Sequence, residues 1–151
     1  MDPLNLPTYL FRIKQDGEKK YIFDEIRRRY VMLTPEEWVR QHVVKYLESA
    51  KHFPHSLIAI EKGFKQLQRK QRYDLLIFDR QGEPLMIVEC KAPAVEIDQK
   101  SFDQANRYNQ KHKAPFMLIT NGRKHFCCQI DPVNKKYRFL QEIPDFSEMI
   151  R

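Results

Sequence analysis

Two short apolar runs separated by a glycine-containing break are the feature that most constrains this chain. The runs span residues 75–78 and 84–88, and the break between them is Asp79-Arg80-Gln81-Gly82. Short β-prone runs on either side of a turn signal are typical of two antiparallel strands. The sequence therefore predicts a β-hairpin near the middle of the chain.

The loop of this hairpin determines which of its residues face each other. With Gln81 and Gly82 as a two-residue loop, Arg80 pairs with Glu83 and, further along the strands, Asp74 pairs with Glu89. Side chains alternate along a strand, so one face is expected to carry two acids and a lysine beside apolar residues. The predicted face consists of Asp74, Leu76, Phe78, Leu85, Ile87, Glu89 and Lys91. Carboxylates that oppose each other repel, so the pair Asp74 and Glu89 is predicted to hold a cation.

Length and charge predict one globular domain with a polyanionic partner. The chain has 151 residues, 42% of them hydrophobic, and a formal net charge of +7. A basic excess favours nucleic acid as a partner, although it also favours solubility. Three cysteines, two of them adjacent, form no visible disulfide framework, and neither a signal pattern nor a membrane span is apparent. We therefore expect a cytoplasmic protein.

Helix and strand signals on both sides of the hairpin predict the rest of the fold. Thr34 is a suitable N-cap, Pro35 fits the first helical position, and Glu37 completes a capping box, so a helix is expected from there to about Lys51. A strand at 57–60, a helix at 98–111 and an apolar strand at 115–120 follow. Further strands are expected at 10–13, 21–23, 26–33, 125–130 and 137–140.

This order predicts an α/β domain with a mixed central sheet flanked by helices on both faces. The strand–helix–strand connection after the hairpin is expected to be parallel and right-handed. We divide the single domain into an accessory N-terminal β segment, an αβββαβ core and a C-terminal β extension, at 1–33, 34–122 and 123–151.

The acids and the lysine suit phosphodiester hydrolysis. A divalent ion held by two carboxylates can activate water and neutralise developing charge, and Mg²⁺ prefers oxygen ligands. Asp74 and Glu89 are the predicted ligands, with the backbone carbonyl of Cys90 as a further oxygen. Lys91 is predicted to orient the attacking water or to neutralise charge. The alternative is a solvated strand end with an ordinary salt bridge.

The pattern Asp74…Glu89-Cys90-Lys91 resembles the D…(D/E)-x-K signature of the PD-(D/E)XK nuclease superfamily, with Tyr73 in place of the proline. From about residue 24 to 143 the chain is similar to the nuclease domain at the N-terminus of type I restriction enzyme R subunits. The segments that carry this similarity are 33–41, 72–74, 88–93 and 120–122. The resemblance implies Mg²⁺-dependent DNA cleavage, with Mn²⁺ as a substitute, in which Lys91 is the catalytic lysine.

The same resemblance implies roles for residues on both helices. Glu36 matches a glutamate on the first helix of the family, although it could also pair with Arg40. Gln104 and Tyr108 match the Gln-x-x-x-Tyr motif of RecB-type nucleases. Gln104 could instead close a capping box with Ser101, and Tyr108 could simply pack.

Basic residues before the hairpin are candidates for DNA contact. Lys65, Arg69, Lys70 and Arg72 are predicted to contact phosphates, with a polar loop as the alternative. The run 27–29 is either a phosphate contact or a charged strand edge. Glu61 is a weaker candidate for the site.

Motor activity is not expected, because the chain lacks the Gly-x-x-x-x-Gly-Lys-Ser/Thr loop. We expect a free-standing nuclease-like domain or a fragment of a longer protein, with DNA as its partner. Other restriction-modification subunits, or further copies of the chain, are candidate partners. Two alternatives remain open: a catalytically inactive nucleic-acid-binding module and a subunit-docking domain.

Overall fold

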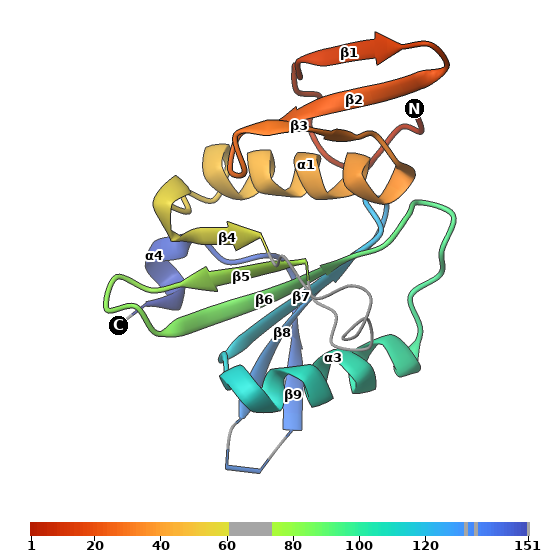
Figure 1. The fold of residues 1–151 in the computed structure, drawn as a ribbon. Coiled ribbons are helices and arrows are strands. Elements are labelled where there is room, and N and C mark those ends of the chain that lie inside the picture. Colours follow the sequence, from red (N-terminus) through yellow and green to blue (C-terminus); the bar gives the residue numbers. More distant parts are fainter. Residues whose placement is uncertain (61–73, 132, 135, 151) are drawn as a thin grey trace.

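The computed structural model describes residues 1–60, 74–131, 133–134 and 136–150. Figure 1 shows the arrangement of its elements. Their bounds are β1 Ile13–Asp16, β2 Lys19–Asp24, β3 Arg29–Met32, α1 Pro35–Ser49, η1 His55–Leu57, β4 Ile58–Ile60, β5 Leu75–Phe78, β6 Pro84–Cys90, α3 Gln99–His112, β7 Phe116–Thr120, β8 His125–Asp131, β9 Lys136–Leu140 and α4 Phe146–Met149.

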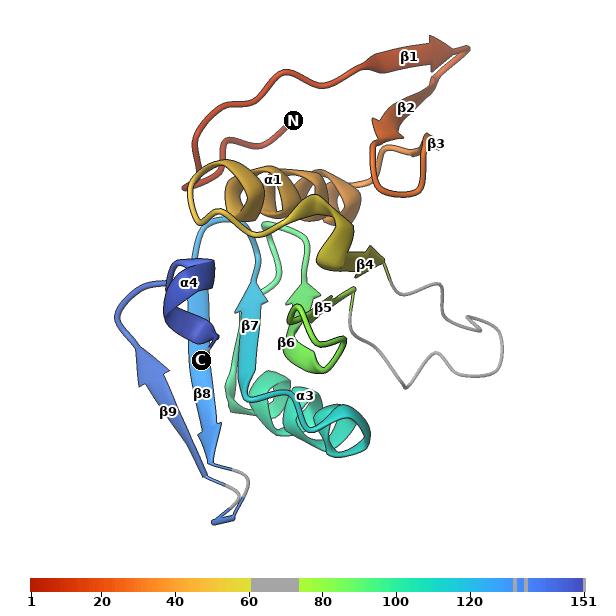
Figure 2. The ribbon, with the colours of Figure 1, turned by 90° about the vertical axis from the view of Figure 1, so that its left-hand side faces the viewer.

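The central sheet has six strands in the order β4-β5-β6-β7-β8-β9. The pair β6 and β7 is parallel, and every other pair in this sheet is antiparallel. Helix α1 covers one face of the sheet and α3 covers the other (Figures 1 and 2). The predicted mixed sheet between helices and the predicted order helix, three strands, helix, strand are therefore confirmed.

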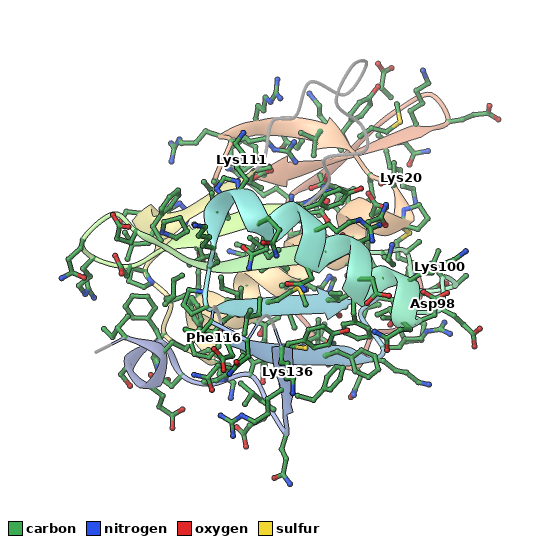
Figure 3. The ribbon with its side chains drawn as sticks, turned by 90° about the horizontal axis from the view of Figure 1, so that it is seen from below. Lys20, Asp98, Lys100, Lys111, Phe116 and Lys136 are labelled. Carbon is green, nitrogen blue, oxygen red and sulfur yellow. The ribbon has the colours of Figure 1, made fainter. Side chains whose placement is uncertain are left out.

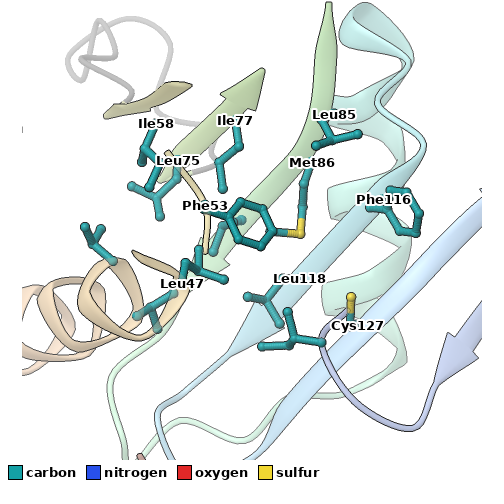
Figure 4. Packing of buried hydrophobic residues seen from close by; sticks show 14 of the residues in the cluster. Leu47, Phe53, Ile58, Leu75, Ile77, Leu85, Met86, Phe116, Leu118 and Cys127 are labelled. Atoms are coloured by element: carbon teal, nitrogen blue, oxygen red, sulfur yellow. The ribbon is translucent and has the colours of Figure 1, made fainter. Parts of the chain in front are cut away.

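Each face of the sheet has its own apolar cluster. Towards α1, Leu47, Leu75, Met86 and Leu118 pack together, as Figure 4 shows. Towards α3, the cluster includes Ile87, Phe102 and Met117. Burial of these side chains on both faces holds the strand ends, and thus the residues that follow them, in fixed positions.

Helix α1 begins as predicted, with Thr34 Oγ1 accepting a hydrogen bond from the Glu37 amide at 3.0 Å. The predicted capping box is only half present, because the Glu37 carboxylate bonds Arg27 and Gln41 instead of the Thr34 amide. The helix ends at Ser49, two residues before the predicted end near Lys51.

The N-cap of helix α3 lies before Ser101, the residue that the alternative capping box would need at that position. Asp98 is the N-cap, and its side chain and that of Ser101 form a reciprocal capping box. A capping box between Ser101 and Gln104 is therefore wrong, since Ser101 occupies the third helical position. Figure 3 shows α3 lying across the sheet, with Asp98 and Lys100 at one end and Lys111 towards the other.

The ends of the chain carry the predicted extra strands, with some differences in their bounds. The strands β1–β3 form a separate three-stranded sheet on the far side of α1 (Figures 1 and 2). The first strand is Ile13–Asp16, not 10–13, because it pairs directly across the turn at Gly17, whose φ is +64°. Helix α4 was not predicted, and its Phe146 packs on Phe53 with ring centroids 5.3 Å apart.

None of the helices in the described part of the chain is long and apolar enough to cross a membrane.

Candidate active site

The hairpin β5–β6 has a three-residue loop, so the predicted two-residue loop is wrong. The Asp79 amide donates to the Glu83 carbonyl at 2.8 Å, and the Gly82 amide donates to the Asp79 carbonyl at 3.1 Å. Gly82 has a φ of +82°, which glycine adopts without steric penalty. Glu83 therefore pairs with Asp79 and not with Arg80.

A bulge then restores the predicted register beyond the loop. Phe78 pairs with Pro84 but Ile77 pairs with Met86, so Leu85 has no partner of its own. The extra residue breaks the alternation, and Leu85 packs with Met86 in the cluster towards α1. Leu85 is thus on the opposite face from the one predicted, whereas Leu75 pairs with Val88 as the prediction required.

Asp74 lies immediately before β5 and forms hydrogen bonds with the residues on either side of Glu89 in the sequence. Its amide donates to the Val88 carbonyl at 2.7 Å. Its carboxylate Oδ2 accepts the Cys90 amide at 2.6 Å, and Oδ1 accepts from Arg40 at 2.5 Å. Both oxygens of Asp74 therefore have partners, and the carboxylate is held next to the strand position occupied by Glu89.

Glu89 is buried, with 6% of its surface exposed, and its two oxygens differ. Oε2 lies 3.0 Å from Lys91 Nζ, as expected for residues on the same side of a strand. Oε1 is buried without a hydrogen-bond partner in the described structure. Burial raises the pKa of Glu89, the charge of Lys91 opposes that shift, and the negative charges of Asp74 and Glu36 add to it.

Arg40 connects Asp74 to α1, a role that the sequence did not reveal. Its guanidinium contacts the carboxylates of Glu37 and Asp74, and Glu36 Oε1 lies 3.7 Å from it. Burial alone would lower the pKa of Arg40, but the charges of Asp74 and Glu37 outweigh burial and raise it.

The same ion pairs extend to the N-terminal sheet. Arg27 lies 3.1 Å from Glu37 and 2.5 Å from the buried Asp24 at the end of β2. A continuous chain of charges, here called the ion-pair chain, therefore runs through Asp24, Arg27, Glu37, Arg40 and Asp74. The run 27–29 does not act as one unit, since Arg27 belongs to this chain while Arg28 and Arg29 are exposed.

The other predicted site residues differ in how the structure connects them to the acids. Glu36 is in the first turn of α1 with 54% of its side chain exposed, and its charge acts on Glu89. Gln104 and Tyr108 are half-buried on α3, the helix that covers the Glu89 side of the sheet. Among the described residues, no hydrogen bond or ion pair joins either of them to Asp74 or Glu89.

The predicted phosphate contacts Lys65, Arg69, Lys70 and Arg72 lie outside the described residues, as do Glu61, Phe64 and Tyr73.

A hard divalent cation fits the donor set at the end of the hairpin. Within the described ranges, no cluster of three or more His, Cys, Asp or Glu side chains is arranged to hold a metal ion alone. Mg²⁺ is commonly held by one or two carboxylates together with water and substrate phosphates, so two acids suffice. Arg40 Nε and Glu89 Oε1 are the buried side-chain atoms that lack a hydrogen-bond partner among the described residues, and of the two only the carboxylate oxygen can bind a cation.

Residues 35–144 match the family model described as type I restriction enzyme R protein N terminus. The chain belongs to this family. No curated protein matches the chain. Among solved structures, it is similar to the fragment structure of a putative HsdR subunit of a type I restriction enzyme from Vibrio vulnificus YJ016, with 21% identity and a TM-score of 0.53. The similarity covers 78% of this chain and 24% of that one, and it supports the R-protein N-terminal fold.

Proposed function

We propose that this R-protein N-terminal domain is a divalent-metal-dependent endonuclease domain that hydrolyses DNA phosphodiester bonds. Asp74 and Glu89 would hold Mg²⁺, or Mn²⁺ in its place, with the Cys90 carbonyl as a further oxygen ligand. The site has the D…E-x-K pattern, and its family is named after a subunit of restriction enzymes. That family context also supports other restriction-modification subunits as partners.

The unpartnered Oε1 of Glu89 is the observation that carries this proposal. A buried carboxylate oxygen without a partner costs roughly 1–3 kcal/mol, so a fold selected only for stability would replace or pair it. The neighbouring Asp74 carboxylate makes this cost larger, because its charge also raises the pKa of Glu89. A cation relieves both effects at once.

The chain's own residues have distinct parts in the proposed reaction. When bound, Mg²⁺ would lower the pKa of water and polarise the phosphate. Lys91, whose side chain is 23% exposed, would donate hydrogen bonds to the attacking water or to a phosphate oxygen. Arg40 holds the Asp74 carboxylate in place, and Glu36 adds negative charge beside the site.

One observation favours an alternative, a nucleic-acid-binding module without catalysis. Both oxygens of Asp74 already accept hydrogen bonds, from Arg40 and from the Cys90 amide. In that module the arginine would neutralise Asp74 permanently, and no metal would be needed. The two functions differ in one result, which is cleavage that depends on Mg²⁺.

Plasmid cleavage by purified protein with Mg²⁺ tests the proposal. Lys91→Ala is expected to lower the cleavage rate about a hundredfold or more, because the transition state loses its cationic donor. Lys136→Ala, which removes an exposed lysine of β9, is the matched control and is expected to cut at the parent rate. Circular dichroism spectra of both variants should overlay that of the parent. Equal rates for the parent and Lys91→Ala, or no Mg²⁺-dependent cleavage by the parent, would contradict the proposal.

A further inference from the structure

The three-stranded sheet β1–β3 precedes the part of the chain that the family model matches, which begins at residue 35. Its two faces differ in character. Ile22 and Asp24 are fully buried, and Asp24 belongs to the ion-pair chain that reaches α1. Since side chains alternate along β2, Tyr21 and Phe23 point to the opposite face, here called the outer face.

The outer face combines aromatic rings with cations. Pairing of the strands brings Tyr30 beside Phe23, with ring centroids 5.2 Å apart. The Arg12 guanidinium lies 3.8 Å from the centre of the Phe23 ring, and Lys14 Nζ lies 4.4 Å from that of Tyr30. Both cations are exposed, while the rings of Tyr21, Phe23 and Tyr30 are half-buried.

By the same alternation, the outer face also carries Lys19, Met32 and Asp16. Met32 is 48% exposed, and Asp16 is the one acid among the strand residues of this face. An exposed surface of this kind attracts a polyanion through its cations. Two of its three rings, Phe23 and Tyr30, lie under a cation, and guanidinium planes and rings are both groups on which a planar ligand can stack.

Unpaired nucleotides are the ligand that uses both properties. Bases stack on aromatic side chains and on guanidinium planes while lysines contact the phosphates, and an open sheet presents these groups in rows. A DNA duplex buries its bases in its own stack, so the rings would gain nothing from it. We propose that the outer face of β1–β3 is a binding platform for single-stranded DNA.

The ion-pair chain connects the sheet that carries this platform to Asp74. Asp24 and Arg27 tie the inner side of the sheet to Glu37, and Arg40 continues from Glu37 to Asp74. A strand bound to the outer face is therefore anchored to the same helix that positions Asp74. The inference deepens the proposed function by naming unpaired DNA as the substrate class.

Fluorescence anisotropy with a labelled oligothymidylate in EDTA tests the platform without any metal. The parent is expected to bind the oligothymidylate more tightly than a duplex of equal length. Phe23→Leu combined with Tyr30→Leu keeps apolar volume but removes two rings, and should weaken binding roughly tenfold or more. Lys14→Gln should lower the slope of log K against log salt by about 0.7, as for one lost phosphate contact.

Matched controls separate the platform from general effects. Phe139→Leu removes a ring that is 50% exposed in a different aromatic cluster, with Phe102, and is expected to leave binding unchanged. Lys136→Ala, which removes an exposed lysine of β9, is also expected to bind as the parent does. If cleavage fails but this binding is found, the proposed catalysis is wrong and the platform stands.

Photocrosslinking of the parent gives a second measurement that needs no variant to fold. An oligonucleotide with 5-iododeoxyuridine is expected to crosslink to Tyr21, Phe23 or Tyr30, as mapped by mass spectrometry. Crosslinks confined to other segments, duplex binding as tight as single-strand binding, or tighter binding of an oligouridylate than of DNA would each overturn the proposal.

Discussion

Asp74 and Glu89 are neighbouring acids at the end of one hairpin, yet the fold surrounds their carboxylates differently. Asp74 has a partner for each oxygen, one from the backbone of Cys90 and one from Arg40. One oxygen of Glu89 pairs with Lys91, and the other is buried without a hydrogen-bond partner in the part of the chain that the structure describes. The contacts of Asp74 are those of a structural acid, whereas the contacts of Glu89 are not.

This difference implies opposite effects of the two acids on the free energy of unfolding. Removing a member of the ion-pair chain should destabilise the domain, because its partners would remain buried and charged. Removing the charge of Glu89 should do the opposite. Proteins commonly retain such a locally unfavourable group where a function requires it.

The largest effect is expected at Arg40. Arg40→Met keeps much of the apolar stem but leaves the carboxylates of Glu37 and Asp74 without their shared cation. All three side chains are at most 15% exposed, so we expect a loss of about 3–5 kcal/mol in the free energy of unfolding. Urea denaturation at neutral pH measures this loss. A change below about 1 kcal/mol would show that the ion-pair chain does not hold Asp74.

A smaller and pH-dependent effect is expected at Asp24. Burial would raise the pKa of Asp24, but hydrogen bonds and charge from Arg27 outweigh it and lower the pKa below its ordinary value of 3.8. The ionised carboxylate therefore stabilises the fold above that pH, and the contribution is lost as the pH falls through the folded pKa. Asp24→Asn should be about 1–3 kcal/mol less stable than the parent at pH 7.

The pH dependence of this difference identifies its cause. Urea denaturation at several pH values should find the gap between parent and Asp24→Asn shrinking below about pH 4. A gap that stays constant down to pH 2.5 would mean that Asp24 acts through packing and not through its charge, with roughly the same loss at every pH.

Much of the central fold was predictable because local signals agreed with each other. The glycine-bearing break indicated a hairpin, the proline at the start of α1 indicated a helix start, and the apolar run of β7 indicated a buried strand. The register next to Glu89 was also predicted, but its cause was not, since a longer loop and a bulge at Leu85 compensate each other. In the sequence, nothing distinguishes the longer loop with its bulge from a two-residue loop without one.

The acids of the site could be predicted from the sequence, but the residues that hold them in place could not. Glu89 and Lys91 share a side of β6 by simple alternation. Arg40 and Glu37 contact residues far away in sequence, and their spacing on α1 indicates only an ordinary pair within a helix. The spacing of Glu37 and Gln41, one turn apart on a helical face with the apolar Val44, was the available sign of a polar network.

Binding of Mn²⁺ to the parent and to Glu89→Gln, measured by titration calorimetry together with the free energy of unfolding, tests the account most directly. Glu89→Gln should be about 1 kcal/mol more stable than the parent at neutral pH, because the buried charge is gone, and should bind no Mn²⁺ in the range where the parent does. A variant that loses stability, or that binds Mn²⁺ as the parent does, would contradict the claim that Glu89 is kept for a metal.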